Sequence, residues 1–156
     1  GLGHGHEASL AARASVEVFQ RSMDASPKVV IEKSHAALSG TRGAAVATGR
    51  LLPTDNQFSF AGVGNIGATL ISSSGSRGLM SHNGTVGIRM RTVQELEYEW
   101  PPGAFLVMHS DGLQSRWDLV NYPGLVNRHA ATIAAVLLRD FIRGRDDTTV
   151  VVIRRS

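Results

Sequence analysis

The order of predicted elements favours an α+β protein, in which α-helices flank an antiparallel β-sandwich. Two patterns with helical spacing fill the first forty residues, and short alternating runs follow through the middle of the chain. A third helical pattern and a final apolar run close the sequence. A chain of 156 residues is long enough for one domain with a real core, so we expect a single domain over residues 1–156.

The N-terminal part predicts two helices. The first covers residues 7–23, where apolar residues at i, i+4, i+7 and i+11 form one stripe: Ala12, Val16, Phe19 and Met23. The second begins at Ser26-Pro27, with serine as the N-cap and proline in the first turn, and ends near Gly40. Its predicted inner face consists of Val30, Ile31, Ser34 and Leu38.

The middle of the chain predicts short strands separated by turns. The expected strands cover residues 43–51, 57–63, 66–72, 92–100 and 105–109, with a short return strand ending at 79–80. Turns or loops are expected at 53–56, 73–76, 82–87 and 101–103. Residues 92–100 alternate apolar and acidic side chains, which is typical of an edge strand.

The C-terminal part predicts a helix followed by a strand. The helix covers residues 129–143, where four apolar residues share one face: Ile133, Val136, Leu137 and Phe141. The last strand covers residues 148–153.

Composition narrows the function classes. The net charge is +3, but aromatic residues make up only 6% and no basic stripe with interleaved aromatics is present, so we expect no nucleic-acid partner. The basic charge is better explained by attraction of a phosphorylated partner. The absence of cysteine excludes disulfides and thiolate metal sites and fits a cytoplasmic location. No apolar stretch approaches the ~18 residues that span a bilayer, so no membrane association is expected.

Two acidic segments carry most of the chemistry. An apolar run over residues 105–109 leads into Ser110-Asp111-Gly112, and Asp146-Asp147 leads into the apolar run over 148–153. A carboxylate at the end of a rigid strand suits Mg²⁺ or Mn²⁺, which prefer oxygen ligands. Two such ions about 3.5–4 Å apart lower the pKa of a shared water, which then attacks a phosphoryl group. An ordinary Asp-Gly turn at Asp111 and an Asx turn at Asp146-Asp147 are the structural alternatives.

The opening residues 1–6 also have two interpretations. Their glycines permit close approach of the backbone to an ion or a phosphate, or they form a flexible terminus. His109, Ser110 and Asp111 contain the residue types of a catalytic triad, but neighbours on a strand point to opposite faces, which argues against one.

Six segments in this order resemble one family: residues 1–5, 42–47, 60–65, 83–87, 106–113 and 143–154. The sequence is similar to the metal-dependent serine/threonine protein phosphatases of the type 2C superfamily, and within it to the bacterial SpoIIE/RsbX-like branch. The resemblance covers essentially the whole chain and implies a β-sandwich flanked by helices. It also implies phosphatase activity on a phosphorylated STAS-domain regulator, an anti-sigma-antagonist-like protein, in partner-switching control of sigma factors.

The resemblance implies a role for individual residues. Asp111 matches the aspartate of the family's Ser-Asp-Gly motif, Asp146 matches its late metal-binding aspartate, and Asp147 is the neighbour of that residue. Gly1 matches the first glycine of the Asp-Gly-x-Gly-x-Gly motif, whose backbone carbonyl binds metal in the family. The implied catalytic residues are therefore Asp111 and Asp146. The implied metal ligands for two Mn²⁺ or Mg²⁺ ions are Gly1, Asp111, Asp146 and Asp147.

The bridging aspartate of that motif and the first strands of the family domain would lie before Gly1. We therefore expect an N-terminally truncated domain, with an aspartate directly preceding Gly1 in the parent protein. Some relatives carry an anti-sigma-type kinase domain ahead of this one, which is a further expected partner domain. The alternative function is a non-catalytic, partner-binding domain of the same fold.

Overall fold

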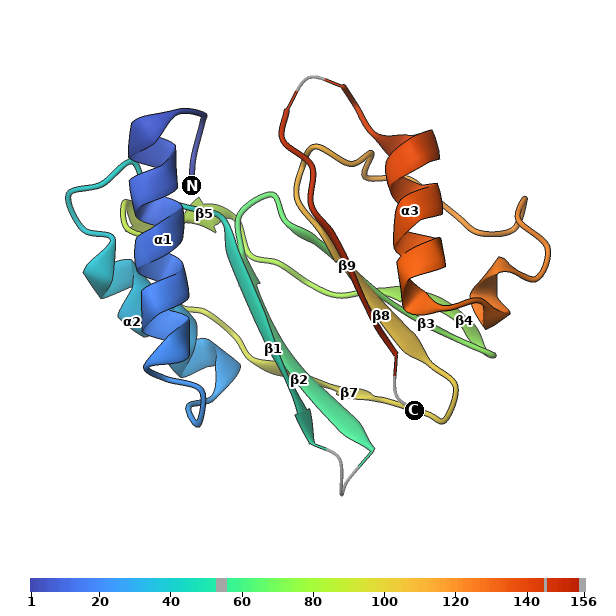
Figure 1. Cartoon of the computed structure of the whole chain (residues 1–156). Helices are drawn as coiled ribbons and strands as arrows, with labels where there is room; N and C mark the ends of the chain where they lie inside the picture. The colour runs from blue at the N-terminus through green and yellow to red at the C-terminus, as the bar shows by residue number, and fades with distance from the viewer. Residues whose placement is uncertain (53–55, 145, 155–156) are drawn as a thin grey trace. The chain divides into compact units, whose positions relative to one another are not determined.

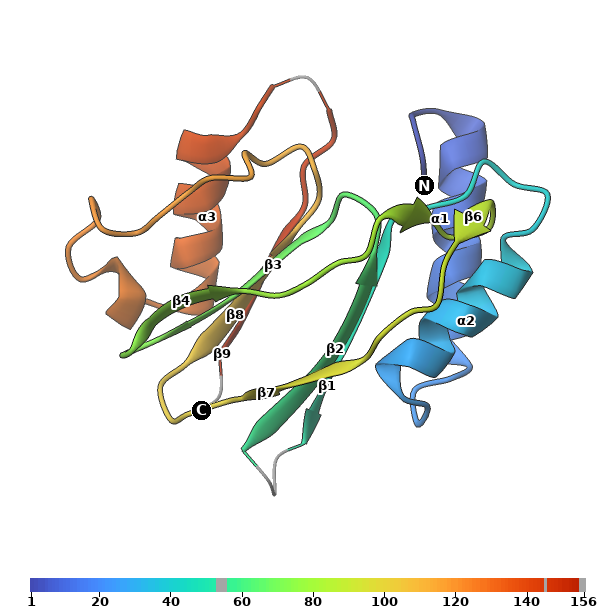
Figure 2. The same ribbon diagram turned by 180° about the vertical axis from the view of Figure 1, so that it is seen from behind.

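The computed structural model describes residues 1–52, 56–144 and 146–154, which form two compact units. The first unit combines Gly1–Ile66 with Met80–Trp100, and the second combines Gly67–Leu79 with Pro101–Ser156. Three residues of the turn expected at 53–56 and position 145 of the last acidic segment lie outside the described residues. Figures 1 and 2 show the elements of each unit from opposite sides.

The first unit begins with two helices that pack on each other, α1 (His6–Gln20) and α2 (Pro27–Ala37) (Figure 1). Both helices were expected. Their predicted C-terminal ends lie about three residues beyond the observed ends. Ser26 occupies the N-cap position of α2 and Pro27 the first turn, as predicted. The predicted inner face of α2 is buried throughout, so the pattern identified this face correctly.

The first unit also contains a three-stranded antiparallel sheet in the order β1-β2-β7. Its strands are β1 (Val46–Leu52), β2 (Gln57–Val63) and β7 (Leu96–Glu99). Strand β7 pairs with β2 at the edge of the sheet, which confirms an edge strand within residues 92–100, although it is shorter than expected. Helix α2 packs against β1 and β2.

A small hairpin in the first unit was not predicted. Strands β5 (Gly84–Thr85) and β6 (Arg89–Met90) pair where the sequence indicated a loop over residues 82–87. Ala44 and Val86 exchange two backbone hydrogen bonds of 2.9 Å, which attach the hairpin to the chain ahead of β1.

The apolar stripe that predicts α1 is not the face that the helix buries. Val16, Phe19 and Met23 are 54%, 44% and 68% exposed, whereas Ala8 and Ala11 are buried. Small side chains on the buried face allow the helix backbone to approach its neighbours closely, and this selected the alanine face over the bulkier one. Hydrophobic periodicity predicts that a helix is present, but it does not predict which face is buried when the space available admits only small side chains.

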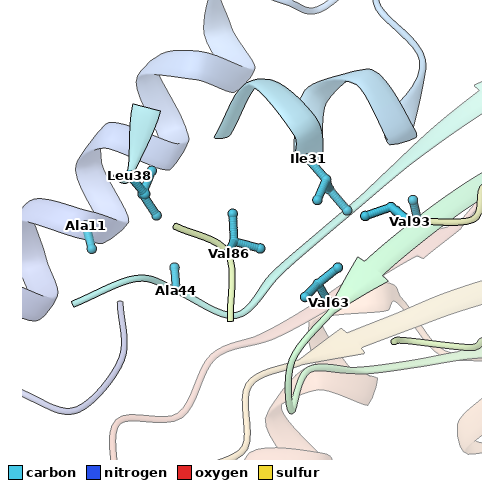
Figure 3. Packing of buried hydrophobic residues seen from close by; sticks show 8 residues of the cluster. Ala11, Ile31, Leu38, Ala44, Val63, Val86 and Val93 are labelled. Atoms are coloured by element: carbon cyan, nitrogen blue, oxygen red, sulfur yellow. The ribbon is translucent and has the colours of Figure 1, made fainter. Parts of the chain in front are cut away.

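The core of the first unit draws on distant parts of the sequence: Ala11, Ile31, Leu38, Ala44, Ala61, Val63, Val86 and Val93. Figure 3 shows Ile31, Val63 and Val93 pointing toward one another, so α2, β2 and the segment before β7 share one apolar centre. Val86, which precedes β6, is fully buried in the same cluster. The hairpin is therefore anchored by packing as well as by hydrogen bonds.

The second unit is built on a four-stranded antiparallel sheet in the order β4-β3-β8-β9 (Figure 2). Its strands are β3 (Gly67–Ser72), β4 (Gly75–Gly78), β8 (Phe105–His109) and β9 (Val150–Arg154). The expected strands are present, but the turn between β3 and β4 is only Ser73-Ser74: β4 begins inside the turn expected at 73–76 and ends before the expected residues 79–80. Burial of β8 is nearly complete, which explains why its sequence is continuously apolar.

A helix packs on this sheet. The 3₁₀ helix η1 (Leu125–Asn127) precedes α3 (Ala130–Phe141), which packs against β9. The cluster between them includes Ile71, Phe105, Val107, Leu125, Ile133 and Leu137. The helical face predicted from residues 129–143 is therefore the face in contact with the sheet. The helix ends at Phe141, ahead of Gly144, because Ile142 forms a β-bridge with Leu113.

Three α-helices and antiparallel sheets confirm the predicted α+β class. The stacking of two sheets as a sandwich, the single-domain organisation and the missing first strands stay predictions. None of the helices in the described part of the chain is long and apolar enough to cross a membrane.

The packing of α1 makes a stability prediction. Replacing Ala11 by leucine adds volume at a fully buried position and is expected to lower the free energy of unfolding by about 1–3 kcal/mol. Ala12→Leu makes the same change one residue along, at a partly exposed position, and is expected to cost less than about 0.5 kcal/mol. Urea unfolding of both variants measures the difference, and equal losses would contradict the assigned face of α1.

A second prediction concerns acid stability. The Asp140 carboxylate accepts hydrogen bonds from Arg139 and from the Tyr122 hydroxyl, and these lower the pKa of Asp140 from 3.8 to about 2. Because the folded-state pKa is depressed, the stabilisation is present above pH 3.8 and is lost as the pH falls toward about 2. Asp140→Asn is expected to remove this part of the acid dependence of unfolding, measured as denaturation midpoints across that pH window. Asp118→Asn, which makes the same charge change in the same unit, should retain the dependence.

Candidate functional site

The two acidic segments meet at one end of a strand pair in the second unit. Strands β8 and β9 are antiparallel, with His109 opposite Val150. The end of β8 therefore lies beside the start of β9, and Ser110-Asp111-Gly112 lies beside the segment that carries Asp146 and Asp147. Two segments separated by more than thirty residues in the sequence are thus brought together by strand pairing.

Ser110 joins the segments with three hydrogen bonds. Its backbone N–H donates to the carbonyl of Thr149 at 3.1 Å, which continues the strand ladder by one step. Its hydroxyl oxygen accepts from the Thr149 N–H at 3.0 Å and donates to the Asp147 carbonyl at 3.3 Å. The serine next to Asp111 therefore fixes the backbone that carries Asp147.

Gly112 permits the close approach of the two segments. A Cβ atom at this position would lie 2.6 Å from the carbonyl oxygen of Asp147 and 2.3 Å from the Oγ1 atom of Thr148. Its own carbonyl accepts a 2.8 Å hydrogen bond from the Arg143 N–H, which follows α3. The glycine of the Asp-Gly pair is required here by space.

The second acidic segment has local hydrogen bonds of its own. The Asp146 carboxylate accepts a 2.8 Å hydrogen bond from the Asp147 N–H, and the Thr148 hydroxyl donates to the Asp146 carbonyl at 3.3 Å. Asp146 and Asp147 are exposed and Asp111 is partly exposed, so all three residues are accessible to solvent. The hydrogen bond of the Asp146 carboxylate goes to the next residue and not to the residue two positions on, so it does not define the Asx turn that was the structural alternative here.

The hydrogen bonds of His109 and Ser110 do not form a catalytic triad. The indole N–H of Trp117 donates to His109 Nε2 at 3.2 Å, which makes Nε2 an acceptor. Nδ1 then carries the proton and faces the Ser110 carbonyl at 2.9 Å. Both ring nitrogens serve to position the end of β8, in agreement with the sequence argument against a triad.

The donor chemistry of this strand end fits a hard divalent cation. Mg²⁺ in proteins is commonly held by one or two carboxylates together with several waters, and Asp111 and Asp146 supply such oxygens. Within residues 1–52, 56–144 and 146–154, no group of three or more His, Asp or Glu side chains that could hold a metal ion occurs. These residues therefore fit an ion that keeps much of its water rather than a site made entirely of side chains.

Gly1 belongs to the first unit, whereas the three aspartates belong to the second. Leu2 N–H donates to the Gly43 carbonyl at 2.9 Å, which ties the opening segment to the chain before β1. A Cβ atom on Gly1 would lie 1.8 Å from the carbonyl oxygen of Ala8, so the chain passes directly against the start of α1. Its predicted role as a metal ligand stays a prediction.

Comparison with known proteins identifies relatives. The family model described as Stage II sporulation protein E (SpoIIE) matches residues 1–156, the whole chain. No curated protein matches the sequence significantly.

Many solved structures are similar to the chain, among them the following three. A chain from work on the bacterial stressosome, described as a modular system adapted to control secondary messenger signaling, has 27% identity and a TM-score of 0.83 over 97% of this chain and 79% of its own. RsbX in complex with magnesium has 21% identity and a TM-score of 0.80 over 97% and 75%. The catalytic domain of the serine/threonine protein phosphatase PstP with two manganese ions has 14% identity and a TM-score of 0.71 over 92% and 80%.

The contact at Gly112 makes a prediction. Gly112→Ala is expected to lower the free energy of unfolding by about 1–3 kcal/mol, because the added methyl group forces the backbone of Asp147 away from the end of β8. Gly78→Ala is the control, since a Cβ atom at Gly78 meets nothing within 4 Å. Urea unfolding compares the two variants, and an unaffected Gly112→Ala protein would mean that the segments do not lie this close.

Proposed function

Because the chain belongs to the SpoIIE family of PP2C-type phosphatases, we propose that it is a Mg²⁺- or Mn²⁺-dependent serine/threonine protein phosphatase. The metal-bound state of RsbX and of PstP supports a dependence on one of these ions. The chain covers more than two thirds of those two structures, and at these identities the likeness concerns the fold.

One observation carries the proposal: the paired ends of β8 and β9 bring two aspartate-bearing segments together. Ser110 and Gly112 hold the segments in contact through named hydrogen bonds and through a distance that excludes a side chain. A rigid strand end limits the freedom of each carboxylate, and a fixed carboxylate loses little entropy when it binds an ion.

The roles of the residues follow from their chemistry. Asp111 and Asp146 would supply carboxylate oxygens to the ions, and Asp147 would add negative charge beside Asp146. Gly1 would contribute its backbone carbonyl. When bound, two divalent ions lower the pKa of a water and neutralise phosphate charge, which is the chemistry that phosphoester hydrolysis requires. Trp117 and His109 would act as positioning residues, because their hydrogen bond holds the end of β8 from which Asp111 projects.

The proposed substrate is a phosphorylated STAS-domain regulatory protein in sigma-factor partner switching. Similarity to RsbX and to a stressosome chain supports this class of partner. The net charge of +3 is compatible with a phosphorylated, acidic partner. An anti-sigma-type kinase domain in the same parent chain is part of the same proposal, as is a cytoplasmic location.

A second candidate is a non-catalytic domain of this fold that binds a phosphorylated partner. The observation in its favour is that the Asp146 carboxylate accepts a hydrogen bond from the Asp147 N–H, a structural role that needs no metal ion. Such a domain would recognise its partner without depending on Asp111 or on divalent ions, which separates the two candidates experimentally.

The test is phosphate release from a phosphoserine STAS-domain protein with Mn²⁺, with Mg²⁺ and with neither, using the parent-length domain and its variants beside the chain of residues 1–156. We expect metal-dependent release that falls by about 100-fold or more in Asp111→Asn and in Asp146→Asn, because each loses a charged ligand that stabilises the transition state. Isothermal titration of Mn²⁺ should show weaker binding in the same two variants.

Asp118→Asn is the matched control, since it makes the same change in the second unit outside both acidic segments. Its activity and its Mn²⁺ affinity should equal those of the unmodified chain. Metal binding that is unchanged in Asp111→Asn would contradict the proposed site. Absence of phosphate release together with metal-independent binding of the phosphoprotein would favour the non-catalytic candidate.

A further inference from the structure

A basic cavity lies in the first unit, lined by residues that the proposed phosphatase site does not use. Its volume is about 530 Å³, and its lining residues are His82, Asn83, Gly84, Arg89 and Arg91. Two arginines and a histidine face this space, and none of these five lining residues is acidic. Cavities of this size hold small molecules or a side chain of a partner protein.

His82 forms one wall of the cavity, and its backbone is held by hydrogen bonds. His82 N–H donates to the Gly62 carbonyl at 2.8 Å, and the His82 carbonyl accepts from the Gly64 N–H at 2.9 Å. These two bonds clamp His82 against the end of β2, where it forms a parallel bridge with Val63. The backbone position of His82 is therefore set by its pairing with the end of β2.

The β5–β6 hairpin provides the second wall. Gly84 pairs with Met90 and Thr85 with Arg89, so the two arginines follow the return strand. Residues two apart on an extended chain share one side, which places Arg89 and Arg91 along the same side of that strand. Gly84, with φ of 152°, has the Arg89 carbonyl oxygen 2.8 Å from where a Cβ atom would be, so the hairpin closes tightly at this point.

The cavity is rich in hydrogen-bond donors. Each guanidinium presents five N–H donors and no acceptor, and the Asn83 amide adds two more donors. His82 Nε2 is buried and makes no hydrogen bond with any residue in the described ranges. Because this atom is covered by protein, the donors assigned to the cavity are those of Arg89, Arg91 and Asn83. An oxyanion with several acceptor oxygens matches all of these groups.

We propose that this cavity binds a phosphate group, with Arg89 and Arg91 as the charged contacts, Asn83 as a hydrogen-bond donor and His82 as part of the wall. Arginine suits phosphate because its planar guanidinium donates two parallel hydrogen bonds to a pair of phosphate oxygens. Free phosphate, a phosphorylated serine of a partner and a nucleoside monophosphate share this chemistry. The proposal does not depend on phosphatase activity, because no lining residue belongs to either acidic segment.

Nuclear magnetic resonance titration tests the proposal. Inorganic phosphate, a phosphoserine peptide and a nucleoside monophosphate are added separately to ¹⁵N-labelled protein in a buffer free of divalent ions, so that a metal-held phosphate cannot contribute. We expect saturable shifts of the Asn83 and Gly84 amides and of the His82 ring. Arg91→Gln should weaken the affinity by about tenfold or more, since it removes a charge-assisted contact.

Arg13→Gln is the matched control, because it removes one positive charge from α1 of the same unit without altering the lining of the cavity. It should bind like the unmodified protein, and Arg91→Lys should recover part of the affinity. The arm that binds most tightly identifies the source of the phosphate group. Absence of shifts in all three arms, or equal weakening by Arg13→Gln and Arg91→Gln in well-folded proteins, would overturn the proposal.

Discussion

The contact between Ser110 and the segment ahead of β9 is the constraint on which the candidate site depends. Strand pairing alone brings His109 opposite Val150, but it does not specify how the chain continues past the paired residues. Ser110 extends the ladder by one backbone bond to Thr149 and adds two bonds through its hydroxyl. The Ser110 hydroxyl accepts from one backbone group and donates to another, so it fixes the contact between the two segments in a way that no apolar side chain could. The proposed roles of Asp111 and Asp146 require this contact between the two segments.

Much of this arrangement could be predicted from the sequence. The apolar runs over residues 105–109 and 148–153 are short and end in acidic residues, and both form strands with nearly the expected bounds. That their acidic ends meet could only be inferred from the resemblance, because register and neighbour choice depend on packing that a local pattern does not contain. The contribution of Gly1 stays a prediction, because Gly1 belongs to the first unit and the three aspartates belong to the second.

The buried face of α1 and the β5–β6 hairpin differ from the sequence predictions, and both differences have physical causes. Helix α1 was recognised from its bulky stripe, yet it buries Ala8 and Ala11, because close packing on α2 favours small side chains. The β5–β6 hairpin was assigned as a loop because strands of two residues contain no period to detect. Its stability comes from elsewhere in the chain, through the paired backbone groups of Ala44 and Val86 and the burial of Val86.

The positions of the charged residues indicate more about possible partners than the net charge does. A net charge of +3 spread over 156 residues does not distinguish a nucleic-acid partner from a phosphoprotein or from no charged partner. The structure resolves this charge into local environments of opposite character. Exposed and partly exposed carboxylates lie where β8 meets β9, and two arginines with a partly buried histidine line the cavity beside the β5–β6 hairpin. Carboxylates repel a phosphate unless a cation lies between them, whereas guanidinium groups bind it directly. If both proposals hold, the chain would recognise a phosphorylated molecule in two independent ways, of which only the first requires a metal ion.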